Sequence, residues 1–193
     1  MMRIITGKAR GVKLSAPAGE ETTRPTAERT KEAIFSMIQF ETEGREVLDL
    51  FAGSGQLGME ALSRGARSAV FVDASAEAVS VIEKNLLKTR LAPEAEVVKT
   101  DYRDFLRRCK NRRKFDLVFL DPPYAMGALP VALGDLLAWD LLLPGALLIC
   151  ETASPEDVFG GDQSLAKQFE VRRQARYGAA QVTLLFRSGE VDA

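Results

Sequence analysis

Short apolar runs alternate with amphipathic segments between residues 46 and 150. Alternating strands and helices at this spacing build a parallel sheet that is covered by helices on both faces. The sequence therefore predicts an α/β fold. The runs of strand length are 47–51, 69–72, 95–98, 116–120 and 146–150, and the segments with helical spacing are 57–63, 76–88, 102–110 and 129–139.

The C-terminal part of the chain departs from this alternation. Strand-like runs at 169–173 and 181–186 flank a turn at 177–180, and this pattern predicts a hairpin. A hairpin places neighbouring strands in opposite directions, so we expect the sheet to close with an antiparallel strand.

The N-terminal part is expected to be separate. Residues 3–6 and 12–14 flank a glycine-containing turn, which predicts a basic hairpin, and residues 15–23 resemble a linker. Thr26 is expected to cap a helix that runs from Ala27 to about Gln39. The predicted boundaries are 1–24 for the hairpin and linker and 25–188 for the main domain.

The composition limits the chemistry that the chain can perform. Among its 193 residues there is no histidine, which excludes a Ser-His-Asp triad, a Cys-His pair and a His-ligated zinc. Cys109 and Cys150 form no metal or redox motif, so we expect no metal and a reduced, cytoplasmic protein. No apolar run approaches the roughly 20 residues that cross a bilayer. Transfer from an activated donor is compatible with these limits.

A glycine-rich turn, Gly53 to Gly58, follows the first expected strand and has the spacing G-x-G-x-x-G. Such a turn lets the backbone approach a nucleotide closely, and Asp73 at the end of the next strand is placed to accept ribose hydroxyls. A dinucleotide and S-adenosylmethionine both remain possible. For the second ligand, Asp49 could hold the ammonium group. Asp101 could accept from the adenine amine, cap the following helix, or do both.

The sequence Asp121-Pro122-Pro123-Tyr124 follows the strand expected at 116–120. Two prolines stop the strand and stiffen the chain after it, which fixes the carbonyl of the residue before each of them. A carboxylate, a fixed carbonyl and an aromatic ring suit a planar base that carries an exocyclic amine. Hydride transfer has no need of this motif, so it favours the methyl donor over a dinucleotide.

Basic residues are clustered, although the formal net charge is only −1. A charged cluster is usually a solvated face, but three clusters beside a base-binding motif favour contact with phosphates. The clusters are Arg3, Lys8, Arg10 and Lys13, then residues 107–114, and then Arg172, Arg173 and Arg176.

With these motifs in place, the chain resembles class I S-adenosylmethionine-dependent methyltransferases. It is most similar to the RsmD family of bacterial 16S rRNA guanine-N2 methyltransferases. The likeness covers nearly the whole chain, and the N-terminal segments narrow it to this family. The segments that carry it are Met2–Gly7, Arg24–Thr26 with Arg29, Glu32 and Phe35, Leu48–Gly55, Gly58–Gly65 and Asp121–Tyr124.

The resemblance implies a Rossmann-like, mostly parallel seven-stranded sheet with its last strand antiparallel. It implies methylation of one guanine in 16S rRNA within an assembled or assembling small ribosomal subunit, by a monomer without metal. The expected cofactor residues are Asp49, Phe51, Gly53, Gly55, Asp73, Asp101, Tyr102 and Thr26. The expected residues at the base are Asp121, Pro122, Pro123 and Tyr124, and those at the RNA are Arg3, Lys8, Arg10, Lys13 and Arg24.

Three other functions are weighed against this one. A DNA adenine or cytosine amine methyltransferase normally needs a recognition region for which 193 residues leave little room. A catalytically silent RNA-binding assembly factor would not need the acids Asp49, Asp73 and Asp121. An NAD(P) oxidoreductase leaves the motif at Asp121 unexplained. Finally, the N-terminal hairpin is expected to be an RNA-docking arm outside the core.

Overall fold

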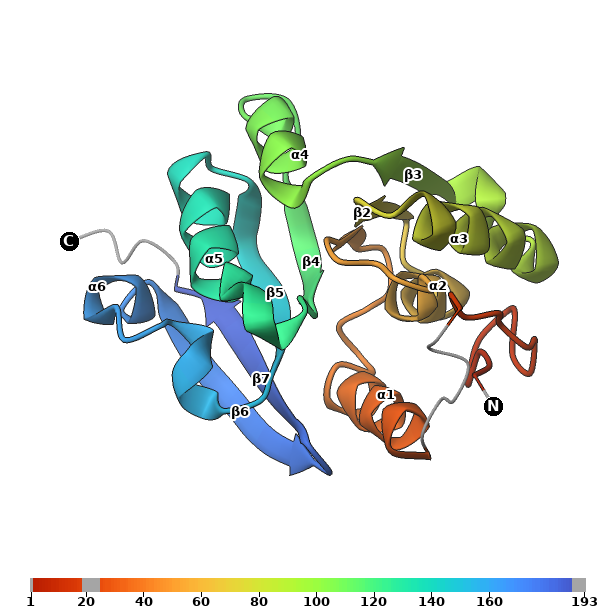
Figure 1. The fold of residues 1–193 in the computed structure, drawn as a ribbon, viewed down its shortest axis with the longest axis horizontal. Helices are drawn as coiled ribbons and strands as arrows, with labels where there is room; N and C mark the ends of the chain where they lie inside the picture. Colours follow the sequence, from red (N-terminus) through yellow and green to blue (C-terminus); the bar gives the residue numbers. More distant parts are fainter. Residues whose placement is uncertain (1, 19–24, 189–193) are drawn as a thin grey trace.

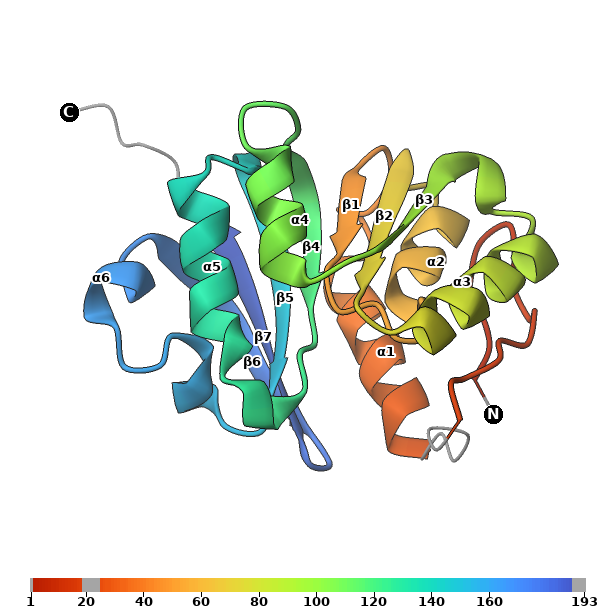
Figure 2. The ribbon, with the colours of Figure 1, turned by 45° about the horizontal axis from the view of Figure 1, so that its top comes forward.

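A single twisted sheet runs through the middle of the molecule in the order β3-β2-β1-β4-β5-β7-β6 (Figures 1 and 2). The computed structural model describes residues 2–18 and 25–188. Strand β7 is antiparallel to both of its neighbours and the other pairs are parallel, as predicted. The strands are β1 (Glu46–Asp49), β2 (Ser68–Asp73), β3 (Ala95–Lys99), β4 (Phe115–Leu120), β5 (Leu142–Thr152), β6 (Phe169–Tyr177) and β7 (Ala180–Arg187).

Helices cover both faces of the sheet because successive strand residues point to opposite sides. In β4, Phe119 belongs to the core that includes Phe35 and Met59, whereas Leu120 belongs to the core that includes Leu106. The first core is covered by α1 (Pro25–Met37), α2 (Gln56–Ser63) and α3 (Ala76–Thr89), and the second by α4 (Tyr102–Cys109) and α5 (Ala128–Ala138). Four short elements complete the fold: η1 (Ala92–Glu94), η2 (Tyr124–Met126), η3 (Pro155–Val158) and α6 (Gln163–Ala166).

Several predicted boundaries differ from those of the structure, and two of the differences have a clear physical reason. Helix α1 begins at Pro25, so Thr26 lies inside the helix and is not its N-cap. Proline suits a first helical position because the N–H that it lacks would have no partner there. Strand β5 begins at Leu142 and runs through Pro144, with an irregularity in its pairing to β4. Pro144 has no N–H to donate, which accounts for an interruption of the hydrogen bonds between β4 and β5 that does not end the strand.

The N-terminal segment forms the predicted hairpin, closed by an antiparallel bridge between Arg3 and Lys13. It is nevertheless part of the core, and the expectation of a separate arm is wrong. Met2, Ile4 and Leu14 are buried in the same cluster as helices α1 and α2. These apolar residues alternate with the basic ones, so one side of the hairpin faces the core and the other faces water.

A buried carboxylate attaches this hairpin to α2. The side chain of Glu60 is fully buried and accepts hydrogen bonds from the N–H groups of Ile5 (2.7 Å) and Thr6 (3.0 Å). The ammonium group of Lys31, on α1, donates to the carbonyl of Arg3 at 2.6 Å. Burial lowers the pKa of Lys31. Separating these buried charged groups from their partners would leave them unpaired at a high cost in free energy, so the hairpin is held in a fixed position.

Residues 15–18 continue along α3. The Asn85 side chain accepts from the N–H of Ser15 at 2.8 Å and donates to its carbonyl at 2.9 Å. Asn85 also donates to the carbonyl of Ser54, in the glycine-rich turn, at 3.0 Å. The first part of the predicted linker is therefore fastened beside that turn, while residues 19–24, including Arg24, lie outside the described residues.

Close packing at Gly7 gives a direct test of this attachment. Gly7 and Gly11 both have positive φ, but a Cβ at Gly7 would lie 1.7 Å from the carbonyl oxygen of Ser63, whereas one at Gly11 would meet nothing within 4 Å. Gly11→Ala should lower the free energy of unfolding only by the strain of alanine in a left-handed backbone conformation, about 1–2 kcal/mol. Gly7→Ala should cost at least ~2 kcal/mol more in urea unfolding. Equal losses would contradict a packed hairpin.

Candidate active site

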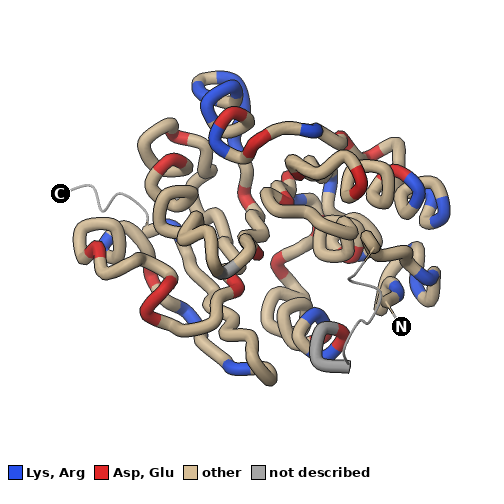
Figure 3. Tube along the Cα trace, viewed as in Figure 1, with Lys and Arg blue, Asp and Glu red and all other residues tan. Residues whose placement is uncertain are grey.

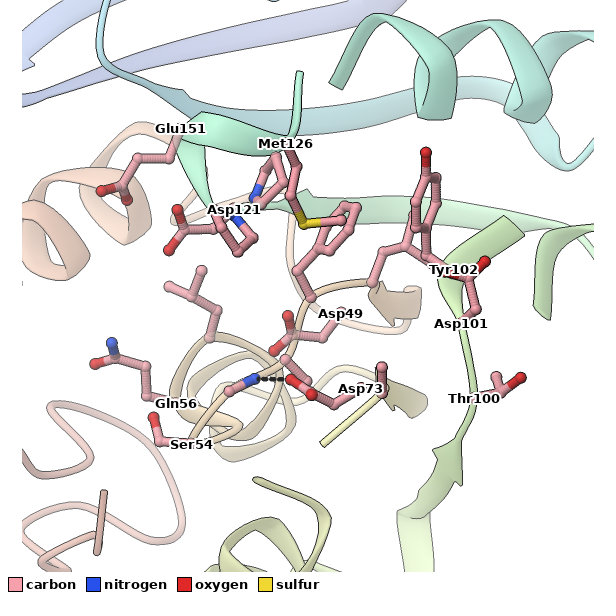
Figure 4. Close-up of a pocket in the computed structure, with 18 residues that line it drawn as sticks. Asp49, Ser54, Gln56, Asp73, Thr100, Asp101, Tyr102, Asp121, Met126 and Glu151 are labelled. Carbon is pink, nitrogen blue, oxygen red and sulfur yellow. Dashed lines mark hydrogen bonds between the residues drawn. The ribbon is translucent and has the colours of Figure 1, made fainter. Parts of the chain in front are cut away.

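A large cavity lies at the carboxyl ends of the strands, where the strand order reverses between β1 and β4 (Figure 4). Ligands of open α/β sheets bind at this position. Its volume of about 570 Å³ suits a ligand of nucleoside size. The lining residues are Asp49, Leu50, Phe51, Ala52, Gly53, Ser54, Gln56, Leu57, Asp73, Ala74, Thr100, Asp101, Tyr102, Asp121, Pro122, Pro123, Met126 and Glu151.

Asp49 ends β1 and is only 3% exposed. Its Oδ2 accepts a hydrogen bond from the N–H of Gly58, on α2, at 3.0 Å. Burial, with a smaller contribution from the nearby charge of Asp73, raises the pKa of Asp49 to about 7, against the opposing effect of the Gly58 hydrogen bond. A carboxyl group in this state gains a full negative charge most readily when a cation arrives next to it.

The glycines of the turn serve different purposes. Gly53 lines the cavity with φ +53°, and its N–H donates to Asp73 Oδ2 at 2.9 Å. Gly55 is outside the lining. A Cβ there would lie 2.8 Å from the Met59 side chain and 3.2 Å from that of Ile82, so this glycine allows the backbone to enter α2. The contact of Gly55 with the cofactor stays a prediction.

Gly58 allows α2 to approach the sheet. A Cβ at Gly58 would lie 2.4 Å from the ring of Phe71 on β2 and 3.2 Å from Asp49 Oδ2. The missing side chain thus brings the Gly58 N–H within reach of Asp49. The third glycine of the motif positions the acid and does not touch the cavity itself.

Asp101 and Tyr102 lie at one end of the cavity in Figure 4. The Asp101 carboxylate accepts from the N–H of Arg103 at 2.9 Å and from that of Asp104 at 3.4 Å, which confirms its role as a helix cap. It also lines the cavity. The rings of Phe51 and Tyr102 lie 5.0 Å apart. This end therefore offers an acceptor beside flat apolar surface, which suits a purine ring.

Asp121 lies at the other end of the cavity, next to Glu151 (Figure 4). Strand β4 ends at Leu120, as predicted, and Pro122 is buried directly after it. Tyr124 opens η2, but its side chain lies outside the described residues. The motif therefore follows β4 to the cavity in the predicted way, with Asp121, Pro122 and Pro123 all in the lining.

Nine lining residues were not predicted as site residues: Leu50, Ala52, Ser54, Gln56, Leu57, Ala74, Thr100, Met126 and Glu151. Glu151 is the most informative of them because it is an acid at the end of a strand. The strand was predicted to end at residue 150, one residue before this acid. Parallel strands end at the same edge of a sheet, so the acid after residue 150 was the signal.

The predicted RNA-binding residues do not gather at the cavity. Arg3 forms an ion pair with Glu28 at 2.7 Å, and Lys8 forms one with Glu94. The backbone N–H of Lys8 also donates to the carbonyl of Ser63. Ser63 is the last residue of α2, and this end of the helix points away from the cavity. Arg10 and Lys13 are exposed and form no ion pair with the described residues, whereas Arg24 and the side chain of Thr26 lie outside the described part of the chain.

The second basic cluster also lies away from the cavity. Figure 3 shows Lys and Arg gathered at the end of α4, just before β4 begins. Three of its members pair with acids: Arg107 with Asp104, Arg113 with Glu96, and Lys114 with Asp140. In the third cluster Arg172 pairs with Glu41. Part of the positive charge of these clusters is therefore paired within the fold.

The lining of the cavity distinguishes the two cofactors that the sequence left open. It holds five carboxyl groups and, among the residues that define it, no Lys or Arg. A pyrophosphate would be repelled by these acids, whereas a sulfonium and an ammonium group are attracted. Within residues 2–18 and 25–188 no cluster of three acids or cysteines is placed to hold a metal, and no helix is long and apolar enough to cross a membrane.

Comparisons with known proteins agree with this choice. A family model described as Conserved hypothetical protein 95 matches residues 2–186. Ribosomal RNA small subunit methyltransferase D of Haemophilus influenzae is 40% identical over 152 residues, 78% of each chain. The solved structure of yhhF from Escherichia coli, a candidate methyltransferase, is 30% identical with a TM-score of 0.82, covering 98% of this chain and 99% of that one. SMU.776, solved with S-adenosylhomocysteine, shares the fold at 15% identity and a TM-score of 0.66, over 80% of this chain and 48% of its own.

The fold, the acidic cavity and the similarity to these proteins place the chain among the class I S-adenosylmethionine-dependent methyltransferases. Within that class, the chain belongs to the RsmD family.

The position of Gly58 gives a test of the site. Alanine in a helix interior normally stabilises by up to about 1 kcal/mol relative to glycine. This gain is expected for Gly134→Ala in α5, where a Cβ meets nothing within 4 Å, without effect on the cofactor. Gly58→Ala should instead weaken S-adenosylmethionine binding at least about tenfold in calorimetry, because the Cβ displaces Asp49 or Phe71. Parent-like affinity in Gly58→Ala would show that the site does not depend on this contact.

Proposed function

We propose that this protein transfers a methyl group from S-adenosylmethionine to the exocyclic N2 amine of one guanine in 16S rRNA. The observation that carries the proposal is the position of Asp121, which follows β4 into the acidic end of the cofactor cavity. The name of the Haemophilus influenzae relative, a small-subunit ribosomal RNA methyltransferase, supports RNA as the substrate.

The cofactor is held by acids along the cavity. Asp49 takes its ammonium group, Asp73 its ribose hydroxyls, and Asp101 its adenine amine beside the rings of Phe51 and Tyr102. The order of these groups along the cavity in Figure 4, with Asp49 and Asp73 between the Asp101 end and the Asp121 end, supports this arrangement. When bound, the cofactor supplies a methyl group that is already activated, so the chain needs no strong base.

The residues after β4 orient the acceptor. The N2 lone pair of guanine is delocalised into the ring and is a poor nucleophile. Asp121 and the carbonyl of Pro122 accept the two amine hydrogens, which favours a pyramidal nitrogen and strengthens both bonds as the amine attacks. Holding the amine in line with the methyl group can supply several kcal/mol. Tyr124 stacks on the extruded base and offsets part of the cost of unstacking.

The substrate is a small ribosomal subunit, assembled or in assembly, that a monomer of this protein meets in the cytoplasm. The pI of about 5.7 is low for a protein that binds naked RNA, and the pairing of Arg3, Lys8 and Arg113 with acids reduces the positive charge that can contact phosphates. A preformed particle can present its target guanine through shape, so fewer phosphate contacts are needed.

Ribosomal subunits from a strain that lacks the gene provide the test. The parent protein should produce N2-methylguanosine at one nucleotide, read by mass spectrometry of 16S rRNA. Asp121→Ala should lower the rate at least about 100-fold with cofactor affinity within about threefold, because the acid acts on the amine. Asp104→Ala removes an exposed acid outside the cavity and should keep parent activity. Methylation of another atom, or full activity in Asp121→Ala, would contradict the proposal.

A further inference from the structure

Glu151 reaches the cavity from β5, next to Asp121. Phe119 of β4 pairs with Ile149 of β5, and both belong to the same core cluster on one face of the sheet. Asp121 and Glu151 each come two residues later, so they continue on that face at the same level. Neighbouring strands lie about 4.8 Å apart, which places the two acids side by side. Figure 4 shows them together at one end of the cavity.

The fold holds Glu151 in a fixed position. Its backbone is in register with Val182 of β7 on one side, and the preceding residue, Cys150, is in register with Leu120 of β4 on the other. The next residue, Thr152, is buried, and its Oγ1 donates to the carbonyl of Ser154 at 2.8 Å. A side chain on a central strand is positioned more precisely toward a ligand than a side chain on a loop.

The bases that carry an amine differ at the ring nitrogen beside it. In guanine this nitrogen, N1, carries a hydrogen, so the edge presents adjacent donors at N1 and N2. In adenine and cytosine the corresponding nitrogens, N1 and N3, present a lone pair instead. An ionised carboxylate can only accept hydrogen bonds. Two neighbouring carboxylates therefore match guanine, whereas adenine or cytosine would set a lone pair against one of them.

We propose that Glu151 is a specificity-determining residue that accepts the N1–H of the target guanine while Asp121 accepts from its N2 amine. This inference rests on the proposed function, because it names how the same site chooses its base. A site with a fixed hydrogen-bond partner rejects a base that lacks the matching group, because its own polar atom is then left unpaired.

The test exchanges the hydrogen at N1 and leaves the amine in place. Reconstituted small subunits carry either guanosine or 2-aminopurine riboside at the nucleotide mapped above. 2-Aminopurine keeps the amine that receives the methyl group but lacks both the N1 hydrogen and the C6 oxygen, so the change of the preference on substitution of Glu151, and not the preference itself, reports on N1. The parent protein should prefer guanosine by about 100-fold or more in kcat/KM.

Glu151→Gln should reduce this preference at least about tenfold, because the amide can donate to the bare nitrogen of 2-aminopurine and still accept from guanine. Glu151→Asp keeps an acceptor and should keep the preference for guanosine at a lower rate. Glu156→Gln is the matched control. Glu156 is exposed outside the cavity and accepts from the Ser154 hydroxyl at 2.9 Å, so its exchange should leave the ratio unchanged.

Two failures can be told apart. If Glu151→Gln methylates both substrates more slowly but with the ratio of the parent, Glu151 has a merely structural role and the inference is overturned while the proposed function stands. If the parent forms no N2-methylguanosine on the guanosine particle, the proposed function fails and the inference falls with it. Melting temperatures of the three variants, measured alongside, show that the ratios refer to folded protein.

Discussion

The buried carboxyl group of Asp49 is the point on which the site depends. It ends β1 where the strand order reverses, and its hydrogen bond to Gly58 sets the distance between the sheet and α2. The glycine-rich turn lies between these two residues, so its path is fixed from both sides. Burial of an acid opposes its ionisation, and the fold keeps this acid beside the negative Asp73. A cationic group on the ligand explains why such an arrangement is retained.

In the proposed function, negative charge at the cavity also determines how RNA approaches. The acids that suit a sulfonium and an amine repel phosphates, so the RNA backbone must remain outside while a single base enters. The same acids continue to the base end with Asp121 and Glu151. In this proposal the cofactor and the base are selected by one property of the cavity: acids at the ends of β1 to β5 and no Lys or Arg among the residues that line it.

The sequence was sufficient for the parts of the site that depend on local order. Alternating strands and helices force the ends of β1, β2 and β4 to one edge, which is why Asp49, Asp73 and Asp121 could be placed together. Glu151 was missed because its neighbour, β4, is known only once the sheet order is known. The hairpin was predicted wrongly for two reasons. Its basic residues alternate with Met2, Ile4 and Leu14, and the prediction used only the charges and not these apolar residues. Ion pairs such as Lys8 with Glu94 join residues that are far apart in the chain, so the sequence does not reveal them.

Proton-linked cofactor binding tests the account most directly. With the Asp49 pKa near 7, the empty site holds a proton below that pH, and an ammonium group must displace it. Affinity for S-adenosylmethionine should therefore rise about tenfold between roughly pH 5.5 and pH 7, a range in which the ligand's amino group, whose pKa is about 7.7–8.0, stays charged. 5′-Methylthioadenosine, which lacks the amino-acid part, should bind equally at both values, and Asp49→Asn should abolish the dependence. If the parent bound S-adenosylmethionine equally at the two pH values, Asp49 would not hold the ammonium group.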